Sequence, residues 1–152
     1  MKNIRVFIPL FSIIILVVSS CTVTLLAPYD EVTDKKTVEL QETILLQINR
    51  WISSYELNPT DTSLKYQNNL EFYNQATTKT ELLLSRNEGV EKNRIVVKQL
   101  AGLLENINEM DSIHRNDDIL NTDDLTAFKT NMSVQLGAIQ KFQQVRKESN
   151  TN

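Results

Sequence analysis

Apolar residues recur at steps of three and four along most of the chain after Asp30, which is the spacing of one face of a helix. Four segments follow this pattern, with turn residues between them. The stripe of the first segment contains Leu40, Ile44, Ile48, Trp51, Ile52 and Tyr55. Asn58-Pro59-Thr60-Asp61 then predicts a turn, because Pro59 disfavours a helical Asn58 and an Asp or Thr side chain can cap the next helix.

The second helix is predicted from about Leu64 and has the thinnest stripe of the four. That stripe contains Tyr66, Leu70, Tyr73, Thr80 and Leu83, with small or polar residues near its centre. Asn87-Glu88-Gly89 is expected to end the helix, with Gly89 in the left-handed conformation that often follows a helix.

The third and fourth helices have clearer stripes. Asn93 is the expected N-cap of the third helix, whose buried face is predicted to contain Val96, Leu100, Leu103, Ile107, Met110 and His114. The fourth helix is expected to begin at Thr122, with Asp123 and Asp124 in its first turn, where acidic side chains suit the helix dipole. Its predicted buried face contains Leu125, Phe128, Met132, Leu136, Ile139 and Phe142. Near its end lie the basic residues Lys141, Arg146 and Lys147.

Four such helices with short connections predict an all-α fold, most economically an up-down-up-down antiparallel four-helix bundle over residues 30-147. The alternative is a flat three-helix arrangement in which the second segment is partly loose. Residues 148-152 are expected to form a disordered tail. Trp51 is the residue whose truncation is expected to cost the core most.

The beginning of the chain has a different pattern. Lys2 and Arg5 precede an apolar stretch from Val6 to Val18, which has the length of a signal-peptide core and is shorter than the roughly 20 residues of a membrane span. Val18-Ser19-Ser20-Cys21 follows and resembles the bacterial lipobox, in which an aliphatic and two small residues precede the lipidated cysteine. We therefore expect residues 1-20 to be a lipoprotein signal peptide and Cys21 to carry the lipid.

An uncleaved membrane anchor from Val6 to Leu26 is the alternative for this region. Polar residues dilute that span at Ser19, Ser20, Thr22 and Thr24. If Cys21 is lipidated, residues 21-29 form a short tether of at most roughly 30 Å. Several acyl chains on one residue hold a protein to a membrane stably. Because Asp after the cysteine is the usual inner-membrane retention signal, Thr22 predicts an outer-membrane location facing the periplasm in a cell with two membranes.

Composition narrows the functional classes. The 152 residues suit one domain, and a content of 41% hydrophobic and 23% charged residues is that of a globular protein. Without Lys2 and Arg5, 14 of the 16 basic residues remain against 19 acidic ones, a net charge of about −5. An acidic domain without basic clusters is a poor nucleic-acid binder, so no nucleic-acid partner is expected. The single cysteine excludes an internal disulfide.

The opening Ala27-Pro28-Tyr29-Asp30-Glu31-Val32-Thr33-Asp34, directly after the lipobox, resembles that of a group of small bacterial lipoproteins without assigned function. The stretches from Lys92 to His114 and from Phe128 to Phe142 are also similar to that group, whereas residues 58-85 depart from it. The resemblance implies a helical, membrane-tethered periplasmic domain and no particular activity. Apart from the resemblance, the opening is interpreted as a helix start capped by Asp30 or Thr33, with a partner-binding epitope as the alternative. Lys35-Lys36 is too small a pair to indicate a lipid-binding patch.

Candidate chemistry is sparse. A nucleophile needs a base within reach, and His114 is the sole histidine while Cys21 is expected to be blocked by lipid. Asp111 and His114 would share one helix face, but a single histidine cannot complete the dimetal sites known in bundles. We interpret His114 as closing the third helix with a partial positive charge. The acidic residues Asp117, Asp118, Asp123 and Asp124 lack the glycine and terminal glutamate of a calcium loop.

These observations predict a membrane-anchored periplasmic lipoprotein that is not an enzyme, uses no metal or cofactor, and acts as a protein-interaction or structural module with an unidentified protein partner. The alternative is a carrier that holds a small apolar ligand or lipid in the bundle core. The thin centre of the second helix, at Ala76 and Thr80, is the only support for that alternative.

Overall fold

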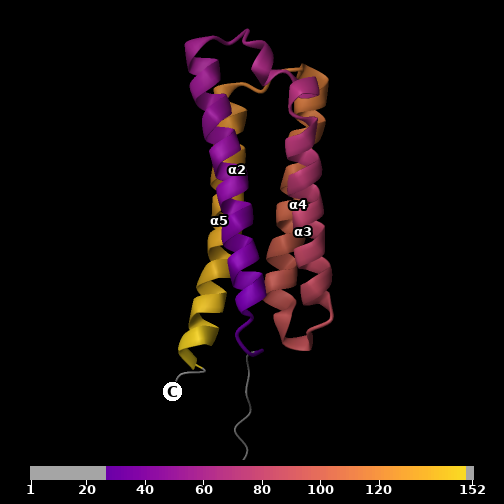
Figure 1. Ribbon diagram of the computed structural model, residues 1–152, viewed down its shortest axis with the longest axis vertical. Coiled ribbons are helices and arrows are strands. Elements are labelled where there is room, and N and C mark those ends of the chain that lie inside the picture. The colour runs from indigo at the N-terminus through magenta and orange to yellow at the C-terminus, as the bar shows by residue number, and fades with distance from the viewer. Residues whose placement is uncertain (1–26, 150–152) are drawn as a thin grey trace, which may run out of the picture.

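The computed structural model describes residues 27–149, and over that range the protein is all-helical, with no strand. Four long helices lie side by side along one axis and pack against each other (Figure 1). They are α2 (Glu31–Leu57), α3 (Leu70–Glu88), α4 (Arg94–Asp117) and α5 (Thr122–Ser149). Three short 3-10 turns, η1 (Thr62–Leu64), η2 (Tyr66–Asn68) and η3 (Glu91–Asn93), lie in the connections. The prediction of four packed helices is confirmed, and α5 continues slightly past the expected boundary at residue 147.

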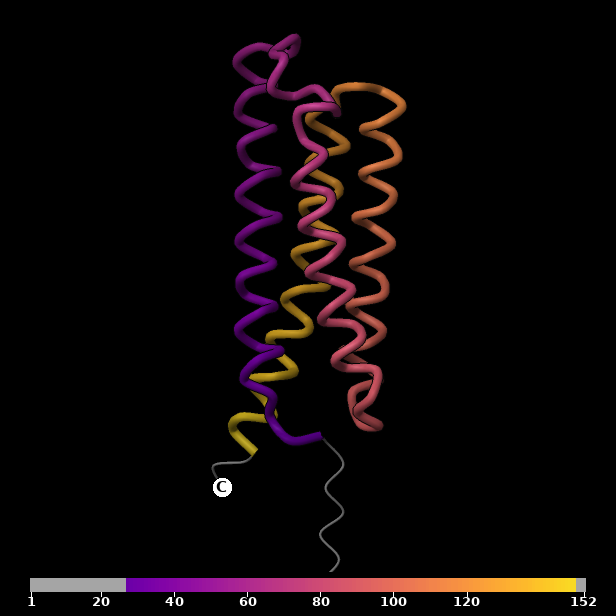
Figure 2. Tube along the Cα trace, turned by 45° about the vertical axis from the view of Figure 1, so that its right-hand side comes forward, coloured from indigo at the N-terminus to yellow at the C-terminus, as the bar shows by residue number. Residues whose placement is uncertain are grey.

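The connections gather at two opposite ends of the molecule (Figure 2). At the first end, the Asp30 amide donates to Gln143 Oε1 over 3.4 Å and Arg146 Nη2 donates to the Lys92 carbonyl over 3.2 Å. We call this the Asp30 end. At the other, which we call the His114 end, the Tyr66 amide donates to the carbonyl oxygen of Asp118 over 2.9 Å.

The core is a continuous stack of the predicted stripes. Every residue of the predicted α4 face is buried, and five of the six predicted α5 residues are buried while Phe142 is half-buried. The α2 stripe is buried through Leu40, Ile44, Ile48 and Trp51. Among the four neighbouring helix pairs, α2 and α3 pack least extensively against each other.

The second helix begins later than predicted, at Leu70 rather than near Leu64. The side chain of Asn69 explains the difference. Its amide nitrogen donates to the carbonyls of Ser63 and Lys65, and its oxygen accepts the indole N–H of Trp51 over 3.0 Å. These bonds hold residues 62–69 in two tight turns against the core, so the regular helix starts only beyond them.

Two predictions about helix ends are wrong. Gly89 has φ −72° and is right-handed, and the extended residue Val90 separates it from the next 3-10 turn. The left-handed residue is instead Asp118, with φ 61°, which follows α4. Asn93 precedes α4, as predicted, but its side chain does not cap the helix and instead donates to Asn87 Oδ1 over 2.8 Å.

We expect Trp51→Ala to lower the free energy of unfolding by about 3 to 5 kcal/mol, because the indole is 4% exposed and its removal leaves a large cavity. Chemical denaturation measures the effect, provided that the m-values of the variant and the wild type are equal. Leu57→Ala is the control, since Leu57 is 88% exposed and its truncation should change stability by less than about 0.5 kcal/mol. A loss below about 1 kcal/mol for Trp51→Ala would contradict the packing described here.

Candidate functional site

The predicted lipidation site and export segment lie outside the described residues, as do residues 22–26 of the tether and residues 150–152. Within residues 27–149, no helix combines the length and apolar character that crossing a bilayer requires. The described chain starts at Ala27, which is buried, and passes directly into the Asp30 end of the bundle. Most of the buried polar side chains of the bundle lie near its two ends.

His114 is the centre of one of these polar groups. Its Nε2 lies 2.7 Å from the Leu64 carbonyl oxygen, which can only accept, so Nε2 carries the hydrogen. Its Nδ1 lies 2.8 Å from the Tyr73 hydroxyl and therefore accepts that proton. Burial lowers the pKa of His114 below its usual value, and outweighs the opposing hydrogen bond to Leu64. His114 lies in the last turn of α4, as predicted, but its ring is buried and engaged by Leu64 and Tyr73, and the lowered pKa disfavours the expected positive charge.

Aromatic rings surround this histidine on three sides. The centroid of the His114 ring lies 5.4 Å from Trp51, 5.5 Å from Tyr66 and 5.7 Å from Tyr73, each in an edge-to-face arrangement. Phe72 completes the cluster by packing edge-on against Trp51 at 5.0 Å. Burial also raises the pKa of the Tyr73 hydroxyl, so this proton donor stays protonated. The cluster joins α2, α3, α4 and the η2 turn into one packed unit.

Asp111, the other half of the predicted metal pair, faces different partners. Its Oδ1 accepts the Tyr66 hydroxyl over 3.0 Å, and its Oδ2 forms an ion pair with Arg115. The Arg115 Nε also donates to the Tyr66 oxygen. The two candidate ligands, Asp111 and His114, are therefore both engaged by protein groups. In the part of the chain that the structure describes, no group of three or more His, Cys, Asp or Glu side chains could hold a metal ion.

The acidic residues of the α4–α5 connection have local roles. Asp118 forms an ion pair with Lys65 over 3.3 Å. Asp123 and Asp124 lie in the first turn of α5, as predicted, and their amides donate to the side-chain oxygen of Asn121. Asn121 is thus the capping side chain, a role that the sequence pattern left unassigned.

The opening of the domain is a helix start, and Asp30 is its cap. The Asp30 carboxylate accepts the amides of Val32 and Thr33 and forms two bonds with Arg86, at 2.9 and 3.0 Å. Partial burial raises the pKa of Asp30, but the hydrogen bonds from Arg86 and Thr33 outweigh it and hold the pKa at about 2. The predicted capping role of Asp30 is confirmed, and the cap is also an ion pair to α3.

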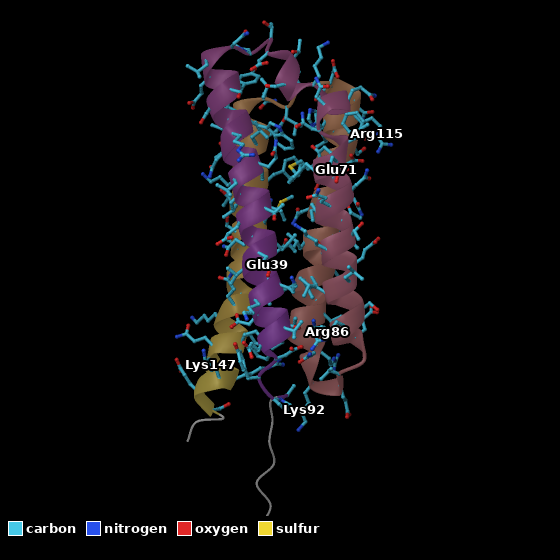
Figure 3. All side chains as sticks on the ribbon, viewed as in Figure 1. Glu39, Glu71, Arg86, Lys92, Arg115 and Lys147 are labelled. Carbon is cyan, nitrogen blue, oxygen red and sulfur yellow. The ribbon has the colours of Figure 1, made fainter. Side chains whose placement is uncertain are left out.

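Tyr29, next to Asp30, connects the opening of the domain to α5. Its hydroxyl donates to Asp34 Oδ2 over 2.8 Å, and this hydrogen bond, helped by partial burial, raises the pKa of Tyr29 to about 12. The Lys147 ammonium lies 5.6 Å from the Tyr29 ring, within range of a cation–π contact. Figure 3 shows Lys147, Lys92 and Arg86 at this same end of the bundle.

A buried polar network lies directly beneath this surface. The Asn87 amide donates to the Thr33 hydroxyl over 3.1 Å and to the Leu83 carbonyl over 2.8 Å, while its oxygen accepts from Asn93. Thr33, Asn87 and Asn93 are all buried. The network ties the first turn of α2 to the end of α3 and to the turn before α4.

Arg146 is the buried residue that the sequence pattern missed. It was expected as a charge near the end of α5, yet it is fully buried, with its guanidinium 4.2 Å from the Phe142 ring. Burial lowers the pKa of Arg146, and Asp30 acts in the opposite direction. Its Nε and Nη1, Gln143 Nε2 and Asn93 Oδ1 are buried without a hydrogen-bond partner among residues 27–149. The sequence does indicate this burial, because Gln143 and Arg146 continue the three-and-four spacing of the buried α5 face after Ile139.

The thin centre of α3, on which the alternative of a ligand in the core rests, lies inside the bundle. Ala76 and Thr80, at the thin centre of α3, are both fully buried, and the Thr80 hydroxyl donates to the Ala76 carbonyl over 2.7 Å. Comparison with known proteins adds no assignment: no family model matches the chain, and no curated protein or solved structure is significantly similar to it.

Because the buried His114 is held neutral, its pKa is lower in the folded than in the unfolded chain, where it is about 6.5. The unfolded state then binds more protons, so this residue's contribution is fully present above pH 6.5 and is lost as pH falls through the folded-state pKa. We expect the wild type to lose stability between pH 7 and pH 5.

Urea denaturation at several pH values measures this loss. His114→Gln removes the titrating ring, so its stability should change less than that of the wild type over the same interval, although it is lower throughout. The carboxylates present in both proteins provide the internal control. Equal changes in the two proteins would show that the folded His114 titrates normally.

Proposed function

We propose that this protein is a bacterial lipoprotein, anchored through lipid on Cys21, whose helical domain is a non-enzymatic protein-interaction or structural module. The observation that carries the proposal is the lipobox-like Val18-Ser19-Ser20-Cys21 directly after an apolar stretch. Ala27 is the sixth residue after Cys21, so the tether between them would span about 20 Å at most. The Asp30 end would then lie next to the membrane, and the His114 end would face away from it.

The finer architecture is part of the proposal. We assign the domain to the up-down-up-down antiparallel class of four-helix bundles, with neighbours in sequence also neighbours in space. The polar contacts support it, because Asp30, Lys92 and Arg146 meet at one end while Leu64, His114 and Asp118 meet at the other. An outer-membrane location facing the periplasm follows from Thr22 in a two-membrane cell.

An interaction role is favoured because the polar side chains that could take part in catalysis are already hydrogen-bonded within the protein. His114, Asp111 and Asp30, the side chains best suited to chemistry, are each bound to other protein groups. Leu46, Leu82 and Val134 are large apolar residues exposed on three different helices, where a partner protein could reach them. The opening at Ala27–Asp34 also resembles that of small helical lipoproteins, which supports the anchor.

The anchor is tested by the mass of the protein purified from bacterial membranes. We expect the wild type to lack residues 1–20 and to carry acyl chains on Cys21, whereas Cys21→Ser should keep the leader and carry no acyl chains. Ser20→Ala keeps a small residue before the cysteine and is the matched control, which should be processed normally. A wild-type mass equal to the uncleaved, unmodified chain would assign residues 6–26 to a membrane anchor instead.

The interaction role is tested by crosslinking in intact envelopes. A photo-crosslinking residue at Leu46 or Val134 should give one discrete crosslinked species of reproducible mass, because both side chains are exposed on the sides of the bundle. The same residue at Thr22 controls for contacts caused by the membrane alone. Crosslinks that occur only at Thr22, with none from the helical domain, would contradict an interaction role for the bundle.

A further inference from the structure

A surface groove runs between α2 and α3, in the half of the bundle nearest to the Asp30 end. It has a volume of about 300 Å³, which is at the lower end of the range for small-molecule sites. Its floor is formed by Val32, Leu82 and Leu83, and its rim by Lys36, Glu39, Lys79 and Arg86. We call it the α2–α3 groove. Glu39 and Arg86 are labelled in Figure 3, on the two helices that border it.

The floor is apolar and open to solvent. Leu82 is 67% exposed and Val32 is 47% exposed, while Leu83 beneath them belongs to the core. The groove exists because α2 and α3 pack least extensively of the neighbouring helix pairs. Covering apolar side chains that are exposed to water along a concave surface lowers the free energy, which favours binding of an apolar ligand.

The rim carries an excess of one positive charge once its ion pairs are taken into account. Lys36 is paired with Glu39 over 2.6 Å, and Arg86 is paired with Asp30. Lys79 donates to the Thr43 hydroxyl over 3.3 Å and makes no ion pair among residues 27–149. Lys79 also helps to lower the pKa of Glu39, so Lys36 and Lys79 share one rim carboxylate and the rim keeps an excess of one positive charge beside the apolar floor.

We propose that the α2–α3 groove binds a fatty acid, with the alkyl chain over Leu82 and Val32 and the carboxylate at Lys79. The single unmatched charge complements a monoanionic carboxylate better than the dianion of an alkyl phosphate. At about 30 Å³ for each water-sized group, the groove has room for about ten carbon atoms. A second copy of this chain is a poorer occupant, because two such rims would bring their lysines together.

The groove inference goes beyond the proposed function and can fail independently of it. All residues of the buried core cluster lie between Leu40 and Ile139, so residues 22–152, made without lipid, retain the whole core. Binding is measured on this domain, in which neither Cys21 nor membrane attachment takes part. Its outcome therefore leaves the anchor experiment unaffected.

The probe is decanoate below its micelle concentration, followed by the methyl resonances of leucine and valine. We expect saturable shifts at Leu82 and Val32, and at least tenfold weaker binding of decyltrimethylammonium, whose head group is cationic. Lys79→Glu should weaken decanoate binding at least tenfold. Lys98→Glu, at an exposed lysine of α4, is the matched control and should leave it unchanged.

A matched pair of variants tests the role of the apolar floor. Leu82→Ser should abolish binding, whereas Val134→Ser should not, since Val134 is equally exposed at 67% but lies on α5. Equal binding of the anionic and cationic probes, or equal effects of Lys79→Glu and Lys98→Glu, would overturn the proposal. So would tighter binding of decyl phosphate, or a dimer in sedimentation that Leu82→Ser dissociates, because each assigns the groove to another occupant.

Discussion

Burial of one apolar stripe from each of α2, α3, α4 and α5 is the constraint on which the structure depends, because the described chain holds no cysteine to crosslink it. The stripe of α4 is aliphatic or aromatic throughout and that of α5 is so as far as Ile139, whereas α3 contributes Ala76, Thr80 and Asn87. Its poorer stripe is supplemented at both ends. An aromatic cluster around His114 closes one end, and hydrogen bonds around Asn87 close the other.

Features that depend on local sequence were predictable. The spacing of α4 and α5 gave their buried faces because a strong three-and-four periodicity leaves few alternatives. The start of α5 at Thr122 and the cap at Asp30 were predictable for the same reason, since each depends on side chains within a few residues. Asp30 shows the limit of this reasoning, because its second partner, Arg86, is 56 residues away.

Features set by distant partners were not predictable from spacing. His114 was assigned a partial positive charge from its position on a helix, but burial lowers its pKa, and its ring nitrogens contact Tyr73 and Leu64, 41 and 50 residues away. The late start of α3 depends on Trp51 and Asn69 in the same way. Arg146 was interpreted from its charge rather than its position in the stripe, because a buried arginine is rare. The α2–α3 groove follows from how closely two helices approach, which no single stripe reveals.

The double attachment of the first turn of α2 has a mechanical consequence. Arg86 of α3 holds the Asp30 carboxylate, and Gln143 of α5 accepts the Asp30 amide. Asp30 therefore links the start of α2 to α3 and to α5 at once, so a force on the chain before Ala27 would be shared among three helices.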